Sequence, residues 1–215
     1  MARVKCCFLI DATGSMSPWI EAAKTQARII MQTLQTEHPG SSFQFAAVFY
    51  RDYGDLEQYY VVPFMQDITD KIQDVEAYGG NDCAEDVAGG FQRMIELDWS
   101  GATLKFAFMI ADAPPHGSRR HASHISDRFR HEPQGSDLAD LVQQCYRREI
   151  RLTVVKVNSS VDKMIDIFDK LYNGTLNVQD MHSQDHPPGG EPDPSIILTP
   201  MVTRLISNTL TILED

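Results

Sequence analysis

The chain has 215 residues, which is enough for one α/β domain with a full hydrophobic core and short for two domains. Its 30 acidic and 19 basic side chains give a formal net charge of −11, which argues against nucleic acid as the main partner because phosphate binding needs clustered Lys and Arg. The four cysteines show no CxxC spacing, which argues against a disulfide framework or a zinc ribbon. We therefore expect a single domain over residues 1–215.

Four apolar runs along the chain predict buried strands, at residues 4–10, 43–50, 104–111 and 150–157. Their near-continuous hydrophobicity indicates burial on both faces, which is typical of a parallel sheet covered by helices. A fifth run, residues 58–65, contains Pro63, which cannot donate to a sheet ladder. We expect this run to form a hairpin with residues 43–50 and to lie antiparallel at an edge of the sheet.

The segments between these runs predict helices, because their apolar residues recur at steps of three and four. The first helix is expected to have Ser17 as its N-cap, with Pro18 at the first helical position. Further helices are expected around residues 87–94, 138–145, 161–171 and 202–213. Gly89 and Gly90 inside the second helix permit a close approach to the sheet.

The order of these elements predicts the fold class. The order is strand, helix, hairpin, helix, strand, helix, strand, helix, which favours an α/β, doubly wound, mostly parallel sheet with one antiparallel edge strand and helices on both faces. Two stretches without periodicity, residues 113–136 and 181–195, are predicted to be surface loops, the second of them mobile. The first holds four histidines and four arginines, so we expect a solvated loop that contacts a partner.

No segment of the sequence predicts a membrane span. The apolar run at residues 4–10 is too short to cross a bilayer and lacks a signal-peptide cleavage pattern. The chain begins at its first strand, and its cysteines indicate no disulfide framework. We therefore expect a cytoplasmic protein without a membrane partner.

Short polar residues follow the predicted strands, at the edge where a doubly wound sheet binds ligands. Asp11 ends the first strand, and the hydroxyls of Thr13 and Ser15 follow at the next alternate positions. Asp112 comes directly after the central strand. A hard cation such as Mg²⁺ prefers oxygen ligands of this kind over imidazole or thiolate. The sequence therefore predicts a site for Mg²⁺ or Mn²⁺.

These residues resemble the metal-ion-dependent adhesion site of von Willebrand factor type A domains, which have a Rossmann-like fold. The first loop of that family reads Asp-x-Ser-x-Ser, and Asp11, Thr13 and Ser15 match it with Thr in place of the first Ser. A hydroxyl is kept at that position, so the ligand chemistry is kept too. The third loop of the family contributes an Asp after the central strand, which Asp112 matches.

The second loop departs from the family pattern. The family normally supplies a Thr after a glycine-rich turn, whereas this sequence has Asn81 and Asp82. Either residue is a candidate ligand, and the additional carboxylate could bind the metal directly, bind it through water or change the metal preference.

A finer resemblance is to the type A domains found with alpha-kinases and related signalling proteins. Four ordered motifs carry it: Asp-x-Thr-Gly-Ser-Met, Tyr-Arg-Asp, a Gly-Gly turn leading to Glu-Asp-Val, and Ala-Asp-Ala-Pro-x-His-Gly. They stand here at residues 11–16, 50–52, 79–87 and 111–117. The chain has no glycine-rich phosphate loop followed by a strand lysine, so it resembles the type A domain without a kinase.

The resemblance implies a non-enzymatic interaction module in which an acidic residue of a partner protein fills an open metal position. By analogy the partner is a kinase, an ATPase or another component of a signalling assembly. One alternative is a Mg²⁺-dependent phosphohydrolase of similar fold, but enzymes of the haloacid dehalogenase type need a second Asp where Thr13 stands. The other alternative is a domain that has lost its metal and binds by shape, which the departure at residues 81–82 favours.

Other polar residues near the predicted site have either a structural role or a place beside the metal. Glu85 and Asp86 fall where a helix begins, where negative charge is favoured, so we expect a structural role for both. Arg51, Asp52 and Asp55 lie in the hairpin turn, either beside the metal or in a solvated turn. The sequence leaves these two alternatives open.

Overall fold

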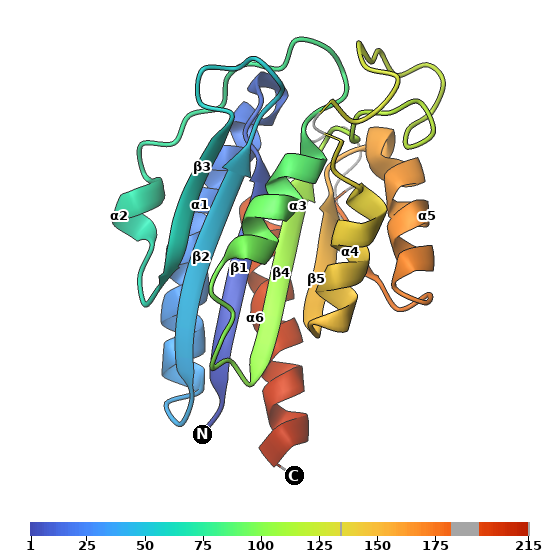
Figure 1. Cartoon of the computed structure of the whole chain (residues 1–215). Helices are drawn as coiled ribbons and strands as arrows, with labels where there is room; N and C mark the ends of the chain where they lie inside the picture. The colour runs from blue at the N-terminus through green and yellow to red at the C-terminus, as the bar shows by residue number, and fades with distance from the viewer. Residues whose placement is uncertain (134, 182–193, 215) are drawn as a thin grey trace.

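The computed structural model describes residues 1–133, 135–181 and 194–214 (Figure 1). Six strands form one sheet in the order β3-β2-β1-β4-β5-β6, and all neighbours are parallel except β2 and β3. The strands are β1 (Arg3–Asp11), β2 (Ser42–Tyr50), β3 (Tyr59–Met65), β4 (Leu104–Ala111), β5 (Ile150–Lys156) and β6 (Asn177–Asp180). The predicted fold class is confirmed, including the antiparallel edge strand β3.

Helices cover both faces of the sheet (Figure 1). One face packs against α1 (Ser17–Glu37) and α6 (Pro194–Glu214), and the other against α3 (Val87–Glu96), α4 (Leu138–Arg147) and α5 (Asp162–Leu171). The short helix α2 (Thr69–Ile72) follows β3, and 3-10 turns at Gly14–Met16 and Ser159–Val161 precede α1 and α5. This layering holds the carboxyl ends of the parallel strands at a single edge.

The continuous apolar runs are explained by two separate hydrophobic cores. Along β1, Phe8 and Ile10 pack in the core beneath α1 and α6, whereas Cys7 and Leu9 pack in the core beneath α3, α4 and α5. Successive side chains of a strand point to opposite faces, so a strand buried on both faces has few polar positions. The sheet is thus anchored from both sides.

Three local features differ from the sequence-based expectations. The polar strand β6 and the single-turn helix α2 were not predicted, because four residues are too few to show a period. Ser17 was predicted to be the N-cap of α1, but Met16 takes that position and Ser17 is the first helical residue. The predicted loop at residues 181–195 lies mostly outside the described residues.

Among the helices that the structure describes, none is long and apolar enough to cross a membrane.

Helix α3 lies so close to the sheet that only glycine fits at residue 90. A Cβ atom at Gly90 would lie 2.8 Å from Cδ1 of Tyr50 and 3.1 Å from Cδ1 of Leu9, both fully buried. We therefore expect Gly90→Ala to destabilise the fold by about 1–3 kcal/mol through overpacking, despite the gain of about 1 kcal/mol in helix propensity. Chemical denaturation measures this change. An unchanged or raised unfolding midpoint would show that α3 moves away from the sheet freely.

Candidate metal centre

The first loop of the candidate site follows β1, where Asp11 is completely buried. Its Oδ1 accepts hydrogen bonds from the backbone N–H of Thr13 at 2.9 Å and from the Thr13 hydroxyl at 2.7 Å. Oγ1 of Thr13 lies 3.4 Å from Oγ of Ser15, which is exposed. The other carboxylate oxygen of Asp11, Oδ2, is buried without a hydrogen-bond partner among the described residues. The loop therefore fixes one oxygen of Asp11 and leaves the other open.

Asp112 follows β4, the strand that pairs with β1 through Ile10 and Ile110. Burial raises the pKa of Asp112, and the hydroxyl of Ser15 beside it opposes this shift. Burial and the charge of Asp112 together raise the pKa of Asp11 to about 7. The structure thus brings together the polar residues that the sequence assigned to the first and third loops: Asp11, Thr13, Ser15 and Asp112.

The second loop approaches the first through its glycine turn. The backbone N–H of Gly14 donates to the carbonyl of Gly79 at 3.3 Å. Gly80 has φ +78°, and a Cβ atom there would lie 3.2 Å from Cβ of Thr13 and 2.9 Å from Oε1 of Glu85. The turn therefore packs between Thr13 and Glu85, and a side chain at residue 80 would separate them.

The two polar residues that follow the turn face another loop. Asn81 is exposed, and its carbonyl accepts a hydrogen bond from the Arg128 guanidinium at 2.8 Å. The carboxylate of Asp82 accepts from the backbone N–H groups of Ala84 at 3.1 Å and Arg128 at 2.7 Å. Within the described chain, no hydrogen bond joins either side chain to Asp11. The second loop therefore uses these residues to hold residues 113–136.

Glu85 lies beside the first loop, a position that the sequence analysis missed. Its side chain is 3% exposed, and Oε2 has no hydrogen-bond partner in the described part of the chain. Burial raises the pKa of Glu85 to about 10, with further contributions from Asp11, Asp52 and Asp55. The sequence analysis expected a structural role at the start of a helix for both Glu85 and Asp86. Asp86 alone has this role, because its side chain caps α3 by accepting from the N–H of Gly89. Glu85 lies one residue before the cap, and this position is the one sequence signal that distinguishes it from Asp86.

Three buried carboxylate oxygens at this edge have no partner within residues 1–133, 135–181 and 194–214: Asp11 Oδ2, Glu85 Oε2 and Asp112 Oδ1. Buried polar atoms are rarely left without a hydrogen bond, so an unsatisfied set at one edge needs a physical explanation. Carboxylate and hydroxyl oxygens are the ligands that Mg²⁺ and Mn²⁺ prefer. The donor set therefore fits a hard divalent cation.

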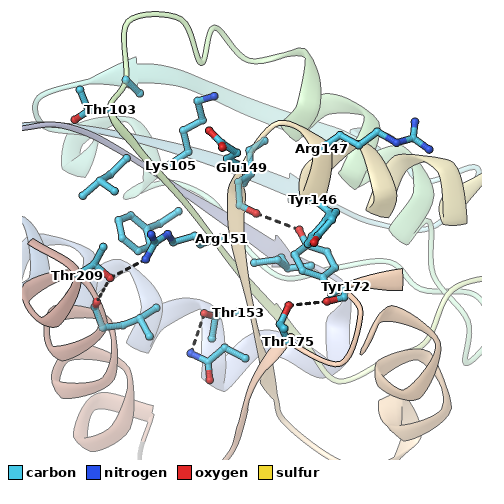
Figure 2. Close-up of a pocket in the computed structure, with 17 residues that line it drawn as sticks. Thr103, Lys105, Tyr146, Arg147, Glu149, Arg151, Thr153, Tyr172, Thr175 and Thr209 are labelled. Carbon is cyan, nitrogen blue, oxygen red and sulfur yellow. Dashed lines mark hydrogen bonds between the residues drawn. The ribbon is translucent and has the colours of Figure 1, made fainter. Parts of the chain in front are cut away.

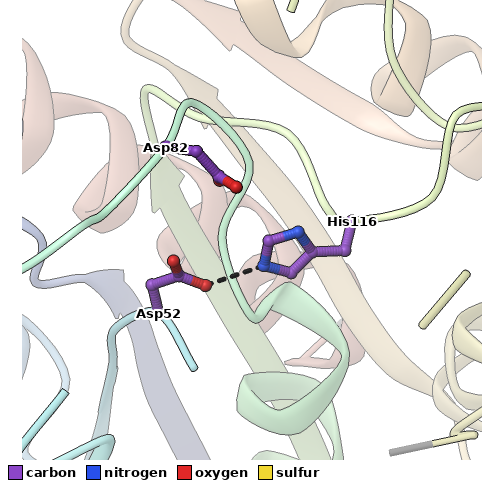
Figure 3. A group of neighbouring side chains, drawn as sticks. All are labelled: Asp52, Asp82 and His116. Atoms are coloured by element: carbon purple, nitrogen blue, oxygen red, sulfur yellow. Dashed lines mark hydrogen bonds and ion pairs between the residues drawn. The ribbon is translucent and has the colours of Figure 1, made fainter. Parts of the chain in front are cut away.

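A second group of acidic and imidazole side chains lies nearby, formed by Asp52, Asp82 and His116 (Figure 3). Their ligand atoms lie within 4.8 Å of one another. However, Nε2 of the fully buried His116 lies 2.7 Å from Oδ1 of Asp52, and Nδ1 lies 2.8 Å from Oδ1 of Asp127. A neutral imidazole has only one N–H, so this geometry requires an imidazolium. We interpret the group as an ion-pair network in which His116 offers no free ligand atom.

The pKa of His116 agrees with this interpretation. Burial lowers it, but the hydrogen bonds and charges of Asp52 and Asp127 outweigh burial, and the net shift is upward. Asp127 also accepts from Nε2 of His121 at 3.0 Å and from the backbone N–H of Gly117 at 2.8 Å. Residues 113–136 were predicted to be a solvated loop, which is wrong for His116 and His121, since both are buried. The sequence around His116 and His121 did not indicate their burial, because their contacts come from residues distant in the chain.

The hairpin turn between β2 and β3 lies against the second loop. The sequence left open whether Arg51, Asp52 and Asp55 lie beside the metal site or in a solvated turn. Arg51 is 1% exposed and donates to the carbonyls of Glu57 at 2.6 Å and Glu76 at 2.8 Å. Oδ2 of Asp55 accepts from the backbone N–H of Gly80 at 3.1 Å. Arg51 and Asp55 are therefore packed beside the candidate site, whereas the tip of the turn at Leu56 is fully exposed.

The imidazolium of His116 generates a pH-dependent prediction. Its folded pKa lies above the usual value of about 6.5, so its stabilisation is present below pH 6.5 and is lost as the pH rises through the folded pKa. We expect His116→Gln to lose about 3 kcal/mol at pH 6, because it leaves Asp52 and Asp127 buried without their cation. Denaturation of both proteins across pH 6–9 measures the difference. A difference that grows with pH would contradict the imidazolium.

Polar loops gathered at the carboxyl edge of a doubly wound sheet, with buried carboxylates from β1 and β4, define a class of α/β domains built to hold ligands at that edge. The von Willebrand factor A domain family matches residues 5–135, so the chain belongs to this family. Domains of this family commonly act as protein-interaction modules and often bind a metal ion.

A curated relative is the alpha-protein kinase vwkA of Dictyostelium discoideum, 29% identical over 170 residues. The match covers 76% of this chain and 27% of that kinase, so the chain spans about a quarter of the relative's length.

Solved structures share the fold at low sequence identity. The pilus adhesin SpaC of Lactobacillus rhamnosus GG in its open conformation has a TM-score of 0.67 and 12% identity, over 97% of this chain and 30% of that one. The vWF domain of the type V pili tip protein Mfa5 of Porphyromonas gingivalis has a TM-score of 0.61 and 12% identity, over 98% and 96% of the two chains. The SpRpn10 VWA domain has a TM-score of 0.56 and 11% identity, over 91% and 94%.

Proposed function

We propose that this domain binds a partner protein through a divalent cation, Mg²⁺ or Mn²⁺, at the carboxyl edge of its sheet, and that it catalyses no reaction. Four residues of the first and third loops hold the cation: Asp11, Thr13, Ser15 and Asp112. Glu85 is the proposed ligand from the second loop, in place of Asn81 or Asp82, which the sequence indicated. When bound, the cation supplies a Lewis-acidic position that an acidic side chain of the partner fills.

The observation that carries this proposal is the set of three buried carboxylate oxygens without a partner, on Asp11, Glu85 and Asp112. A divalent cation would contact all three oxygens at once and offset most of their charge, and no protein group described at this edge does so. Hydrolase chemistry has no comparable support, because Thr13 donates its hydroxyl to Asp11 and provides no second acid.

The similarity to an alpha-protein kinase supports a partner in signalling. That protein carries its matching segment within a chain about four times longer than the match. We propose that the partner is a kinase, an ATPase or another component of a signalling assembly, and that the domain works in the cytoplasm. The partner's contribution is an accessible Asp or Glu, because a carboxylate is the ligand that completes a hard cation's shell.

Metal binding generates a stability prediction. Mg²⁺ at about a hundred times its Kd should stabilise the fold by about 2.7 kcal/mol through mass action. Asp11→Asn should abolish this gain, since it removes a ligand charge while the amide oxygen still accepts from Thr13. Thermal melting in Mg²⁺ and in EDTA measures both effects. Equal melting temperatures of the wild-type protein in the two buffers would exclude the metal-dependent mechanism.

The control is Asp166→Asn, an exposed residue of α5 that changes the net charge equally. It should keep the full response to Mg²⁺. In EDTA the wild-type fold should lose stability as the pH rises from about 4 to about 7, because Asp11 ionises earlier in the unfolded chain than in the fold. Mg²⁺ should remove this loss, and Asp11→Asn should reduce it in EDTA.

Glu85 is distinguished from a structural acid by the contrast between its effects on stability and on metal binding. Glu85→Gln keeps the shape of the side chain and resembles the protonated acid, which is the form that a pKa of about 10 favours at pH 7. We therefore expect it to change the melting temperature in EDTA at pH 7 little and to weaken Mg²⁺ binding about tenfold or more, measured by calorimetry. If the substitution leaves Mg²⁺ affinity unchanged, Glu85 is not a ligand.

A further inference from the structure

A groove of about 870 Å³ lies at the other end of the sheet, where β4 and β5 begin (Figure 2). It crosses from α6 over the start of β5 to the end of α4. Its floor contains the fully buried Phe106, and its walls include Thr153, Thr209 and Tyr146. Because β6 pairs only with residues 153–156, the first residues of β5 are not covered on this side.

Three cations line this groove, against a single acidic residue, Glu149. The guanidinium of Arg151 donates to Oγ1 of Thr209 at 3.1 Å and lies 5.8 Å from the ring centroid of Phe106. Nζ of Lys105 donates to the carbonyl of Arg148 at 2.9 Å. Arg151 and Lys105 have no carboxylate within 4.0 Å in the parts of the chain that the structure describes, whereas Arg147 pairs with Asp140 at 3.7 Å. The bonds of Arg151 and Lys105 to neutral oxygens orient these charges without neutralising them.

The groove therefore has the opposite charge to the molecule as a whole. The chain carries a net charge of −11, and Asp52, Asp55 and Asp82 lie near Asp11 and Glu85 at the carboxyl edge. The groove instead presents Arg151 and Lys105, which have no carboxylate partner in the described chain. A partner with negative charge is attracted to this end and repelled from most of the remaining surface.

The directions of the cations distinguish an extended anion from a compact one. In Figure 2 the side chains of Arg151, Lys105 and Arg147 point in three different directions and do not converge. A phosphate-sized ion needs donors that converge on one point, which this arrangement lacks. Tyr146, 45% exposed, and Tyr172 add an aromatic wall at the end nearest Arg147.

We propose that this groove binds an extended acidic peptide segment of a partner protein, with carboxylates pairing with Arg151 and Lys105 and an apolar side chain against Tyr146. The site uses no metal and no residue of the carboxyl edge, so it does not rest on the metal-dependent function. The domain then has two recognition ends, one that binds a carboxylate through a cation and one that binds carboxylates through side chains.

The test uses a fluorescein-labelled glutamate-rich peptide, with a glutamine-rich peptide of equal length as its control. Fluorescence anisotropy in EDTA at low salt should show binding of the acidic peptide only. Lys105→Ala/Arg151→Ala should weaken this binding about tenfold, and added salt should weaken binding to the wild-type protein. Arg28→Ala/Lys71→Ala removes two exposed cations from α1 and α2, and this variant should bind as tightly as the wild-type protein. Thermal melting confirms that both variants fold.

Three outcomes would overturn the proposal. The first is equal affinity of the wild-type protein and Lys105→Ala/Arg151→Ala for the acidic peptide. The second is an equal loss of affinity in Arg28→Ala/Lys71→Ala, which would indicate a response to net charge alone. The third is displacement of the peptide by inorganic phosphate at a similar molar concentration, which would indicate a compact-anion site. None of these outcomes bears on the response of the melting temperature to Mg²⁺.

Discussion

The edge where β1 and β4 end gathers more buried carboxyl oxygens than the described protein satisfies with hydrogen bonds, and the candidate site depends on this arrangement. Asp11, Glu85 and Asp112 each keep a buried oxygen without a partner in the described chain. An uncompensated buried carboxylate costs several kcal/mol, so the edge cannot hold itself together. The apolar cores on the two faces of the sheet hold it in place. Packing thus fixes the positions of groups that repel one another.

Neighbouring carboxylates show that the same fold is able to satisfy buried acids. Asp127 accepts hydrogen bonds from His116, His121 and two backbone N–H groups. Asp86 accepts from the N–H of Gly89 and from the side chains of Tyr53, Tyr59 and Gln58. Donors are therefore plentiful around the edge, but none of those described reaches this set of oxygens. The proposed cation would supply the contact that these oxygens lack.

Much of the fold follows from the sequence, because each central strand is buried on both faces and reads as a continuous apolar run. The placement of Asp11 and Asp112 follows too, since parallel strands end at one edge. Glu85 and His116 escaped prediction for a different reason. Glu85 is defined by a helix cap that starts one residue later, and His116 by carboxylates 64 and 11 residues away. A local sequence pattern indicates the periodicity and the burial of a segment. The roles of Glu85 and His116 depend instead on partner residues that come close only in the folded chain.

Protons and a divalent cation compete for the same oxygens at this edge, and the competition separates a metal site from a purely structural one. Burial and mutual repulsion raise the pKa values of Asp11 and Glu85, so protons neutralise the edge in acid. Above pH 7 Asp11 ionises, and the fold bears a repulsion that a cation relieves while it displaces protons. A domain that binds by shape alone gains nothing from this arrangement, because Asn or Gln at these positions fills the same space without the charge. The shape-only alternative therefore has to account for three costly carboxylates that shape does not need.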